Sequence, residues 1–356
     1  MPKQIRLLDF GLLSPLRSQV VYHAAAYAMT PDSPNTIILV SSNHPYVCIG
    51  VHQDLEKEVD VEYCDANGLP VYRREVGGGA VYLDSGQVFT QWIFHRENLP
   101  SDLETRFRLY VRPLVETYQA LGINATYRPI NDIHVSGKKI GGTGAAQMGI
   151  AEVVVGSLMF TFDKKTMARV LKVASEKMRD KIFEGLEQYM TTMTEQLGAT
   201  PERAQVVSTY LEKTAAALDA EIVPGEWSAA EEAAAQELDA RMGSDEWLNQ
   251  KGGLRQFGVK IHEDVRVVQA AFKAPGGLIR VIARIREGRI DDLSLSGDFT
   301  MLPAFSVGAL EQAARGVLVA RDLLAARFAQ VYRALAIQSP GVTPEHFAEA
   351  VAAATA

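Results

Sequence analysis

Three consecutive glycines at 77–79 constrain the fold of this chain more than any other feature of its sequence. Glycine loses the most conformational freedom on folding, so such a run is expected where the backbone takes positive φ or approaches another group closely. The run follows a predicted strand at 69–72, with Arg73 and Arg74 close behind that strand. Guanidinium groups are planar donors that suit a carboxylate or a phosphate. The segment indicates either an anion-binding loop or a glycine-rich turn with two solvated arginines.

Two familiar phosphate-binding patterns do not describe this run. No Gly-Lys-Ser or Gly-Lys-Thr closes it, as a P-loop requires, and its glycines lack the GxGxxG spacing of a dinucleotide fingerprint. An anion held here would instead meet exposed backbone amides and the neighbouring arginines.

A second segment, 128–145, combines polar side chains with a tight turn. Its pattern predicts a short strand, a hairpin turn at Ser136, and a second strand that leads into more glycines. A lysine here can place a point charge on a phosphate or acyl oxygen, and Asn131 with Asp132 can offer oxygen ligands to Mg²⁺. The alternative is an ordinary hairpin with exposed polar residues.

The composition is that of a globular protein, and its charge excludes some partners. The 356 residues carry 36 Lys plus Arg against 43 Asp plus Glu, a net charge of −7, and 47% are hydrophobic. An acidic chain has no overall electrostatic attraction for nucleic acid or for an anionic membrane. We therefore expect neither as a partner.

Cysteine usage and the N-terminal sequence indicate a cytoplasmic protein. Cys48 and Cys64 are too far apart for a CxxC pair, and a chain of this size needs no disulfide. The first residues lack the apolar core of a signal peptide, and no later stretch resembles a membrane span.

Short apolar runs and helical patterns alternate along the first half, which predicts the α+β class. Residues 164–242 are rich in Ala, Glu, Gln, Lys and Met, and predict further helices. A linker at 251–253 is expected to precede a small second domain. The expected strands are 36–40, 46–49, 88–94, 258–272, 278–285 and 290–296, and the expected helices are 16–29, 103–121 and a long one from Val307, with a frayed end at 348–356.

Together the two segments change the interpretation. The pattern RRxxGGGxVYxD, followed about fifty residues later by NDIxVxGKKIxGxxA, resembles the lipoate–protein ligase A family of the biotin/lipoate ligase superfamily. The resemblance covers roughly residues 15–185. It implies a mixed β-sheet ligase or transferase domain flanked by helices over 1–250, with its helical segment from about 164, and a small α+β accessory domain over 254–340.

The resemblance also implies a two-step reaction. Lipoate attacks the α-phosphorus of ATP, with Mg²⁺ present, and the acyl-adenylate then passes to a lysine of a carrier. The carrier implied is the lipoyl domain of a 2-oxoacid dehydrogenase E2, a glycine cleavage H-like protein, or a specialised lipoate-binding protein.

Each matched residue receives a role from the family. Lys139 is the implied catalytic residue, because it aligns with the family's essential lysine, while Lys138 should point to the other face of its strand. The implied lipoate-binding residues are Arg74, Val76, Gly77, Gly78, Gly79, Ala80 and Leu83. The implied ATP and magnesium residues are Asn131, Asp132, Lys139 and Gly142, with Asp132 as the magnesium ligand.

The sequence departs from the family in three places. Val76 stands where many members have a small polar residue, and Leu83 where many have histidine. The strand at 153–160 is apolar where the family has a histidine-containing one. These departures leave the adenylation chemistry intact and leave the acyl chain and the subfamily open.

Three alternatives remain. An octanoyl or lipoyl transferase needs no ATP but requires a reactive thiolate; Cys48 lies in an apolar strand pattern and Cys64 in a predicted helix, although the Gly86-Gln87 turn suits that branch. A non-catalytic lipoyl-protein binding module would explain the departures at Val76 and Leu83. Biotin ligation is the third, and the chain lacks its GRGRxG-like loop.

Overall fold

The computed structural model describes residues 3–251 and 265–354. These form two compact units. Unit 1 contains Met1–Cys48, Val59–Tyr72 and Val81–Ser244, and unit 2 contains Ile49–Glu58, Arg73–Ala80 and Asp245–Ala356. The predicted linker glycines at 252–253 and the predicted start of the accessory domain at 254 lie outside the described residues.

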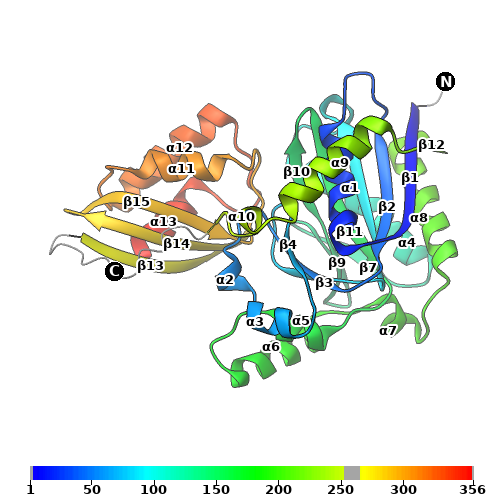
Figure 1. Ribbon diagram of the computed structural model, residues 1–356, viewed down its shortest axis with the longest axis horizontal. Helices are drawn as coiled ribbons and strands as arrows, with labels where there is room; N and C mark the ends of the chain where they lie inside the picture. Colours follow the sequence, from blue (N-terminus) through cyan, green and yellow to red (C-terminus); the bar gives the residue numbers. More distant parts are fainter. Residues whose placement is uncertain (1–2, 252–264, 355–356) are drawn as a thin grey trace. The chain divides into compact units, whose positions relative to one another are not determined.

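Unit 1 is built on a six-stranded mixed sheet with the order β10-β11-β6-β2-β1-β12 (Figure 1). Strand β1 runs parallel to both β2 and β12, while β2, β6, β11 and β10 pair antiparallel. This confirms the predicted α+β class. The strands are β1 (Lys3–Leu13), β2 (Thr36–Ser42), β6 (Gln87–His95), β10 (Gly144–Met148), β11 (Ala151–Met159) and β12 (Ala220–Pro224).

Helices cover both faces of this sheet. The pair α1 (Pro15–Tyr27) and α9 (Ala229–Met242) lies over one face, and α4 (Leu103–Ala120) packs with α8 (Arg203–Leu218) on the other (Figure 1). Trp92 of β6 shows how the second face is closed: its Nε1 donates to the Tyr210 hydroxyl at 3.0 Å, and its ring meets Tyr110 edge-on. All three side chains are fully buried. The sheet is thus a rigid support enclosed by apolar packing.

Local sequence signals account for several helix starts. Ser228 and Glu231 form a capping box, in which each side chain accepts from the other residue's backbone N–H at the start of α9. The Asp102 side chain accepts from Thr105 N at the start of α4. Helix α7 (Met193–Leu197) ends with Gly198 in the left-handed conformation, and α8 begins at Arg203 after Pro201.

Two small three-stranded sheets and several short helices complete the first part of the chain. The sheets have the orders β4-β3-β5 and β7-β8-β9. Their strands are β3 (Tyr46–Ile49), β4 (Val71–Arg73), β5 (Val81–Leu83), β7 (Ala125–Arg128), β8 (Asp132–Val135) and β9 (Lys138–Gly142). The short helices are α2 (Leu55–Glu58), α3 (Val61–Ala66), η1 (Arg96–Asn98), α5 (Lys164–Val170), α6 (Glu176–Tyr189) and α7 (Met193–Leu197).

Unit 2 contains the predicted second sheet, an antiparallel meander of β13, β14 and β15. Alternate residues of β14, among them Val281 and Ile285, are buried against three helices. The elements are α10 (Asp245–Leu248), β13 (Val265–Ala274), β14 (Gly277–Arg286), β15 (Arg289–Gly297), α11 (Ser306–Ala314), α12 (Arg321–Leu335) and α13 (Pro344–Ala353). The part of the first predicted strand at 258–264 lies outside the described residues.

Two predictions for this unit are wrong. The long helix expected from Val307 is two helices, because the chain turns at Gly316, which has φ +76°. The expected frayed end is α13, in which Phe347, Ala348 and Val351 are buried in the core of the unit. An Ala-rich composition alone does not reveal that spaced apolar residues anchor the helix.

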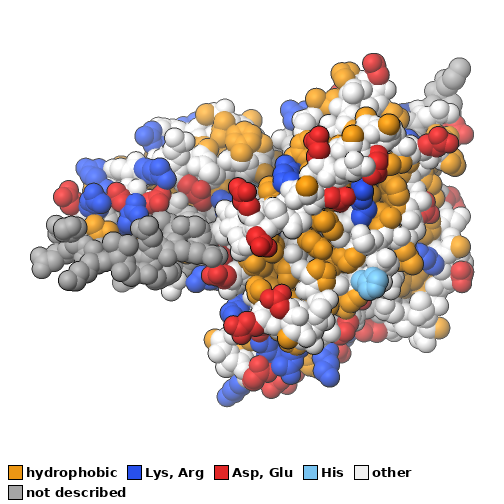
Figure 2. All heavy atoms as spheres, viewed as in Figure 1, with side chains coloured by type: hydrophobic (Ala, Val, Ile, Leu, Met, Phe, Trp, Pro, Cys, Tyr) orange, Lys and Arg blue, Asp and Glu red, His pale blue; other side chains and the backbone are white. Residues whose placement is uncertain are grey.

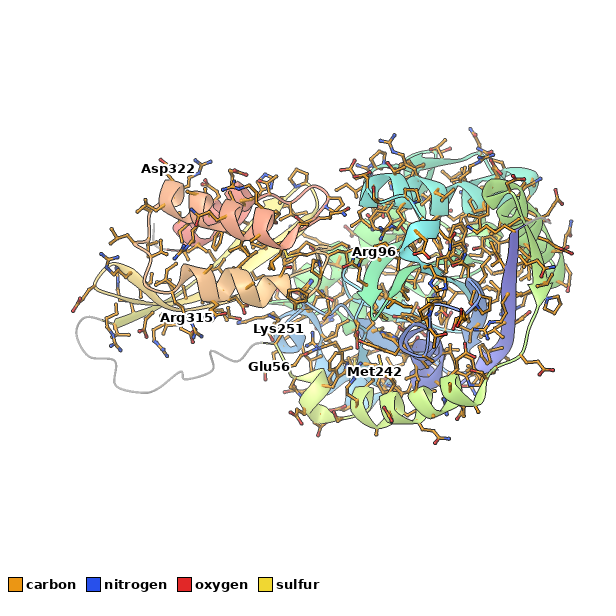
Figure 3. The ribbon with its side chains drawn as sticks, turned by 90° about the horizontal axis from the view of Figure 1, so that it is seen from above. Glu56, Arg96, Met242, Lys251, Arg315 and Asp322 are labelled. Atoms are coloured by element: carbon orange, nitrogen blue, oxygen red, sulfur yellow. The ribbon has the colours of Figure 1, made fainter. Side chains whose placement is uncertain are left out.

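Surface charge is mixed. On the face shown in Figure 2, acidic and basic side chains are interspersed, in line with the modest net charge. Arg96, labelled in Figure 3, reaches from η1 to the buried Glu152 of β11 at 3.0 Å.

Among the described residues, no helix combines the length and apolarity that a membrane crossing requires.

Candidate functional site

The predicted site residues divide between the two units. The residues in unit 1 are Leu83, Asn131, Asp132, Lys139 and Gly142. The residues in unit 2 are Arg74, Val76, Gly77, Gly78, Gly79 and Ala80. Each group has its own geometry.

In unit 1 a hairpin brings Asp132 and Lys139 together. The predicted tight turn joins strands β8 and β9, and in it Ser136 and Gly137 both have positive φ. Lys139 is paired with His134 across the hairpin, and a register shift follows toward Asp132. The Lys139 Nζ lies 2.6 Å from Asp132 Oδ1, and both side chains are partly exposed. The site therefore holds an oriented cation that solvent and ligands can reach.

The neighbouring lysine has a different partner. Lys138 Nζ donates to the Glu187 carbonyl at the end of α6, at 3.1 Å. Strand alternation explains why adjacent lysines turn to different groups. The Lys139 backbone is also fixed, because Thr191 N donates to its carbonyl at 2.9 Å. Lys139 is thus held through both its main chain and its side chain.

Gly142 leaves room for this pair. A Cβ at Gly142 would lie 3.0 Å from Lys139 Nζ and 3.4 Å from Asp132 Oδ1. Asn131 stands just before β8, where its side-chain amide donates to the Thr143 carbonyl and its own carbonyl accepts from Thr143 N at 2.9 Å. The structure therefore brings all four predicted nucleotide residues into one hairpin, and their binding of ATP stays a prediction.

His134 was not among the predicted site residues, yet it lies beside them. Its Nε2 is 3.8 Å from Asp132 Oδ2, its Nδ1 is 3.2 Å from the Gly137 carbonyl, and its side chain is buried. The available signal was its position two residues after Asp132 on the same strand, which places both on one face.

In unit 2 the Arg74 side chain holds the glycine loop in place through hydrogen bonds to its main chain. Its Nη2 donates to the carbonyls of Gly77 at 3.0 Å and Gly79 at 2.8 Å. Between them Gly78 has φ +95°, a conformation that favours glycine. This loop is residues 73–80, and the role of Arg74 toward a carboxylate or phosphate stays a prediction.

Arg73 has no anion-binding role in this structure, so the interpretation of the two arginines as paired anion donors is wrong. Its guanidinium is fully buried and donates to the main-chain carbonyls of Gly50, Val51, Gln53 and Leu248 at 2.6–3.1 Å. A buried guanidinium requires this many acceptors. These acceptor carbonyls belong to stretches of chain far from Arg73 in sequence, so no local sequence pattern predicts them.

The remaining predicted acyl residues are enclosed. Val76 is buried, and its carbonyl accepts from Val51 N at 3.2 Å. Leu83 ends β5 opposite Tyr46 and is buried as well, while Ala80 is half-buried. Their contact with an acyl chain stays a prediction.

Both thiols of the chain are buried. Cys48 lies in β3 and Cys64 in α3, as predicted, and neither side chain is exposed or forms a disulfide. Burial raises the pKa of Cys64 to about 11, and the carboxylates of Asp60 and Asp65 add to this. A thiol with such a pKa is protonated at neutral pH and is a poor nucleophile.

The described residues include no group of three or more His, Cys, Asp or Glu side chains arranged to hold a metal ion. Magnesium in nucleotide sites needs less from the protein, because it takes one or two carboxylates together with phosphate oxygens and water. Asp132 fits that requirement as a single, partly exposed carboxylate.

Comparison with known proteins decides the family. Residues 18–215, more than half of the chain, match the model of the lipoyl protein ligase A/B catalytic domain. The chain belongs to this family. The predicted resemblance is thereby confirmed, and the hairpin and the glycine loop both lie inside the matched region.

Similar sequences in this lipoyl ligase family include both ligases and transferases. The octanoyltransferase LipM of Kyrpidia tusciae is 28% identical over 272 residues, which cover 69% of this chain and 98% of that protein. Lipoate-protein ligase A subunit 1 of Thermoplasma acidophilum is 28% identical over 200 residues, 53% of this chain and 76% of the subunit. Sequence similarity alone therefore shows a lipoate or octanoyl attachment enzyme without separating the two reactions.

Solved structures of the family share this fold. The bipartite lipoate protein ligase of Thermoplasma acidophilum aligns with a TM-score of 0.63 at 25% identity, covering 73% of this chain and 99% of that one. Plasmodium falciparum LipL1 aligns over 98% of both chains with a TM-score of 0.69 at 13% identity, which shows the fold alone.

Proposed function

We propose that this chain attaches lipoate to a lysine of a lipoyl carrier domain in an ATP-dependent reaction that proceeds through lipoyl-AMP. The observation that carries the proposal is the oriented Lys139–Asp132 pair, 2.6 Å apart, in a chain whose two thiols are both buried. A cation of this kind suits a reaction that develops charge on phosphoryl and acyl oxygens.

In the first step a lipoate carboxylate oxygen bonds to the α-phosphorus of ATP, and pyrophosphate leaves. The protein's task in such a step is positioning and charge stabilisation. Lys139 would place its ammonium group on the phosphoryl oxygens, and Asp132 orients that group until the nucleotide replaces it as partner. Bound magnesium would neutralise phosphate charge, with Asp132 supplying one oxygen ligand.

In the second step the carrier's lysine amine bonds to the acyl carbon, and AMP leaves with the electron pair of the broken acyl–oxygen bond. The attacking nitrogen loses a proton to complete the amide. Lys139 would stabilise the oxyanion of the tetrahedral intermediate, which explains why one residue can serve both steps. Residues 74, 76–80 and 83 are the ones proposed to contact the acyl chain.

The state of the thiols supports ligation over a thioester route. A thioester mechanism needs an accessible thiolate. Cys64 has its pKa raised by burial, and Cys48 is enclosed in β3. Support for a carrier of the lipoyl-domain type comes from the structural study of the Thermoplasma acidophilum ligase, which includes its E2 lipoyl domain.

The test is lipoate-dependent release of pyrophosphate from ATP and Mg²⁺. The variants are Lys139→Ala, its neighbour Lys138→Ala as matched control, and Cys48→Ala and Cys64→Ala as single changes. We expect release by the wild type, by the Lys138 variant and by both cysteine variants, and its loss in Lys139→Ala.

Octanoyl transfer is the second candidate, because LipM matches this chain over 98% of its own length. It predicts no pyrophosphate release, acceptance of an octanoyl thioester, and loss of transfer in one cysteine variant. Failure of both reactions would leave a non-catalytic lipoyl-protein binding module.

A further inference from the structure

The glycine loop is packed against a segment far along the chain within unit 2. Gly78 N lies 3.4 Å from the Phe299 carbonyl, to which it donates. A Cβ built on Gly77 would lie 2.8 Å from that carbonyl oxygen and 3.0 Å from the Cα of Thr300. Both obstacles are backbone atoms, which cannot swing aside as a side chain can. A side chain at residue 77 would therefore collide with the backbone of residues 299 and 300.

The third glycine of the run is under no such constraint. A Cβ on Gly79 would be 3.6 Å from the Cβ of Asp298, an ordinary van der Waals contact. Gly77 and Gly79 thus form a matched pair within one loop. A substitution at Gly77 disturbs the contact with 298–300, and the same substitution at Gly79 leaves it in place.

Arg73 provides a second connection. Its guanidinium donates to the Leu248 carbonyl through Nε at 3.0 Å and Nη2 at 2.7 Å. In return the indole Nε1 of Trp247 donates to the Arg73 carbonyl at 2.8 Å. The start of the glycine loop is thus bonded in both directions to helix α10.

The connecting segment at 50–53 completes the assembly. Val51 N donates to the Val76 carbonyl at 3.2 Å, and Gly297 N donates to the His52 carbonyl at 3.0 Å. The His52 ring stacks on Phe299 with 5.2 Å between the ring centroids. Main-chain hydrogen bonds therefore run from the glycine loop through this segment to the end of β15.

We propose that Arg73 and the segment 297–300 are positioning residues for the glycine loop. They fix the conformation in which the loop receives the acyl chain, and they make the loop and the C-terminal part of unit 2 change conformation together. Neither Arg73 nor the segment touches the reacting atoms in this account. The inference rests on the proposed function in one respect, the assignment of the loop to the acyl substrate.

Hydrogen–deuterium exchange of the full chain tests the coupling without any need for activity. Gly77→Ala should raise exchange about tenfold both in peptides covering 73–80 and in those covering 295–301. Gly79→Ala should leave 295–301 at the wild-type rate. Equal behaviour of the two variants at 295–301 would overturn the proposal.

Milder variants cover the case in which Gly77→Ala fails to fold. Trp247→Phe keeps an aromatic ring and removes the indole N–H that donates to the Arg73 carbonyl, so exchange in 73–80 should rise although the change lies in α10. Arg73→Lys should loosen 245–250 together with the loop, whereas Arg74→Lys should loosen the loop alone. A loop unaffected by Trp247→Phe and Arg73→Lys would contradict the coupling.

Kinetics then separate positioning from mere stability. With lipoate, ATP and Mg²⁺, Trp247→Phe should raise the KM for lipoate several-fold and leave the KM for ATP unchanged, because Asn131, Asp132 and Lys139 belong to unit 1. A parallel rise of both KM values would show a structural effect only. Absence of pyrophosphate release in the wild type would defeat the proposed function while leaving the exchange result valid.

Discussion

The hairpin of unit 1 and the glycine loop of unit 2 present their chemistry in different ways. The hairpin offers side chains: strand register places the Lys139 ammonium 2.6 Å from the Asp132 carboxylate. The loop offers backbone, and its two arginines, Arg73 and Arg74, donate hydrogen bonds to main-chain carbonyls. One region is therefore sensitive to the loss of a charge, and the other to the gain of a side chain.

Under the proposed function, this difference would separate the chemistry from the selection of the acyl chain. An ammonium group on a short hairpin can stabilise the negative charge that develops on oxygen in both reaction steps. A backbone surface shaped by close packing can only accept or exclude a chain by its fit. We therefore expect changes in the hairpin to lower kcat and changes in the loop to raise the KM for lipoate.

The largest expected effect is on the hairpin. Lys139→Ala removes the charge proposed to stabilise both transition states, and should lower the rate of lipoate-dependent pyrophosphate release about 10²–10³-fold. Lys138→Ala should keep the wild-type rate, because that lysine bonds the Glu187 carbonyl instead. A similar loss of rate in the two variants would show that the position of Lys139 beside Asp132 does not make it the catalytic lysine.

A buried charge also stabilises unit 1. Glu152 is fully buried and accepts from Arg106, its buried partner, and from the more exposed Arg96. Arg106→Met removes the buried partner and should lower the free energy of unfolding by about 3 kcal/mol. Denaturant unfolding followed by fluorescence measures this. The matched control is Arg112→Met on the same helix, whose exposed pair with Glu116 should contribute about 0.5 kcal/mol at most.

Unit 2 should respond to pH through His52. Burial lowers the pKa of this histidine from 6.5 to about 3, with Lys251 and Arg73 adding to the effect. Below pH 6.5 this histidine is protonated in the unfolded chain but stays neutral in the folded chain. The free energy of unfolding therefore falls as the pH falls. Lowering the pH from 7 to 5 should reduce the free energy of unfolding by about 2 kcal/mol through this group.

Denaturation at a series of pH values measures that slope. His52→Gln should reduce the pH dependence over this range, whereas the exposed His44→Gln should leave it as in the wild type. An unchanged slope in His52→Gln would show that the histidine is protonated within the folded unit.

The smallest effect expected is backbone strain in the loop. Gly78 has φ +95°, so Gly78→Ala should lower the free energy of unfolding by about 1 kcal/mol and raise the KM for lipoate. Gly185→Ala in α6, where an added Cβ meets nothing within 4 Å, should stabilise the protein slightly. Thermal denaturation of both variants compares the two positions.

The sequence was sufficient to predict the hairpin, because its signals are local. A turn at Ser136 and Gly137 with alternating neighbours determines which lysine joins Asp132. The α+β class, the position of Cys48 in an apolar strand and that of Cys64 in a helix follow from equally short-range patterns.

The features that were missed depend on long-range contacts. The sequence predicts that Arg73 donates hydrogen bonds to an anion. In the structure its guanidinium donates instead to the main-chain carbonyls of the segment 50–53 and of Leu248. The exclusion of a side chain at Gly77 depends on residues more than two hundred positions away.

The most direct test of ligation through an adenylate is to stop the reaction before the carrier is added. Wild-type protein is mixed with lipoate, ATP and Mg²⁺, quenched in acid, and separated into small molecules and intact protein for mass spectrometry. We predict lipoyl-AMP in the small-molecule fraction and an unmodified protein mass, with Lys139→Ala forming lipoyl-AMP at a rate lower by the same factor as its pyrophosphate release. No lipoyl-AMP from the wild type would contradict it, and so would a protein that gains an acyl group from an octanoyl thioester and loses that gain in Cys48→Ala or Cys64→Ala.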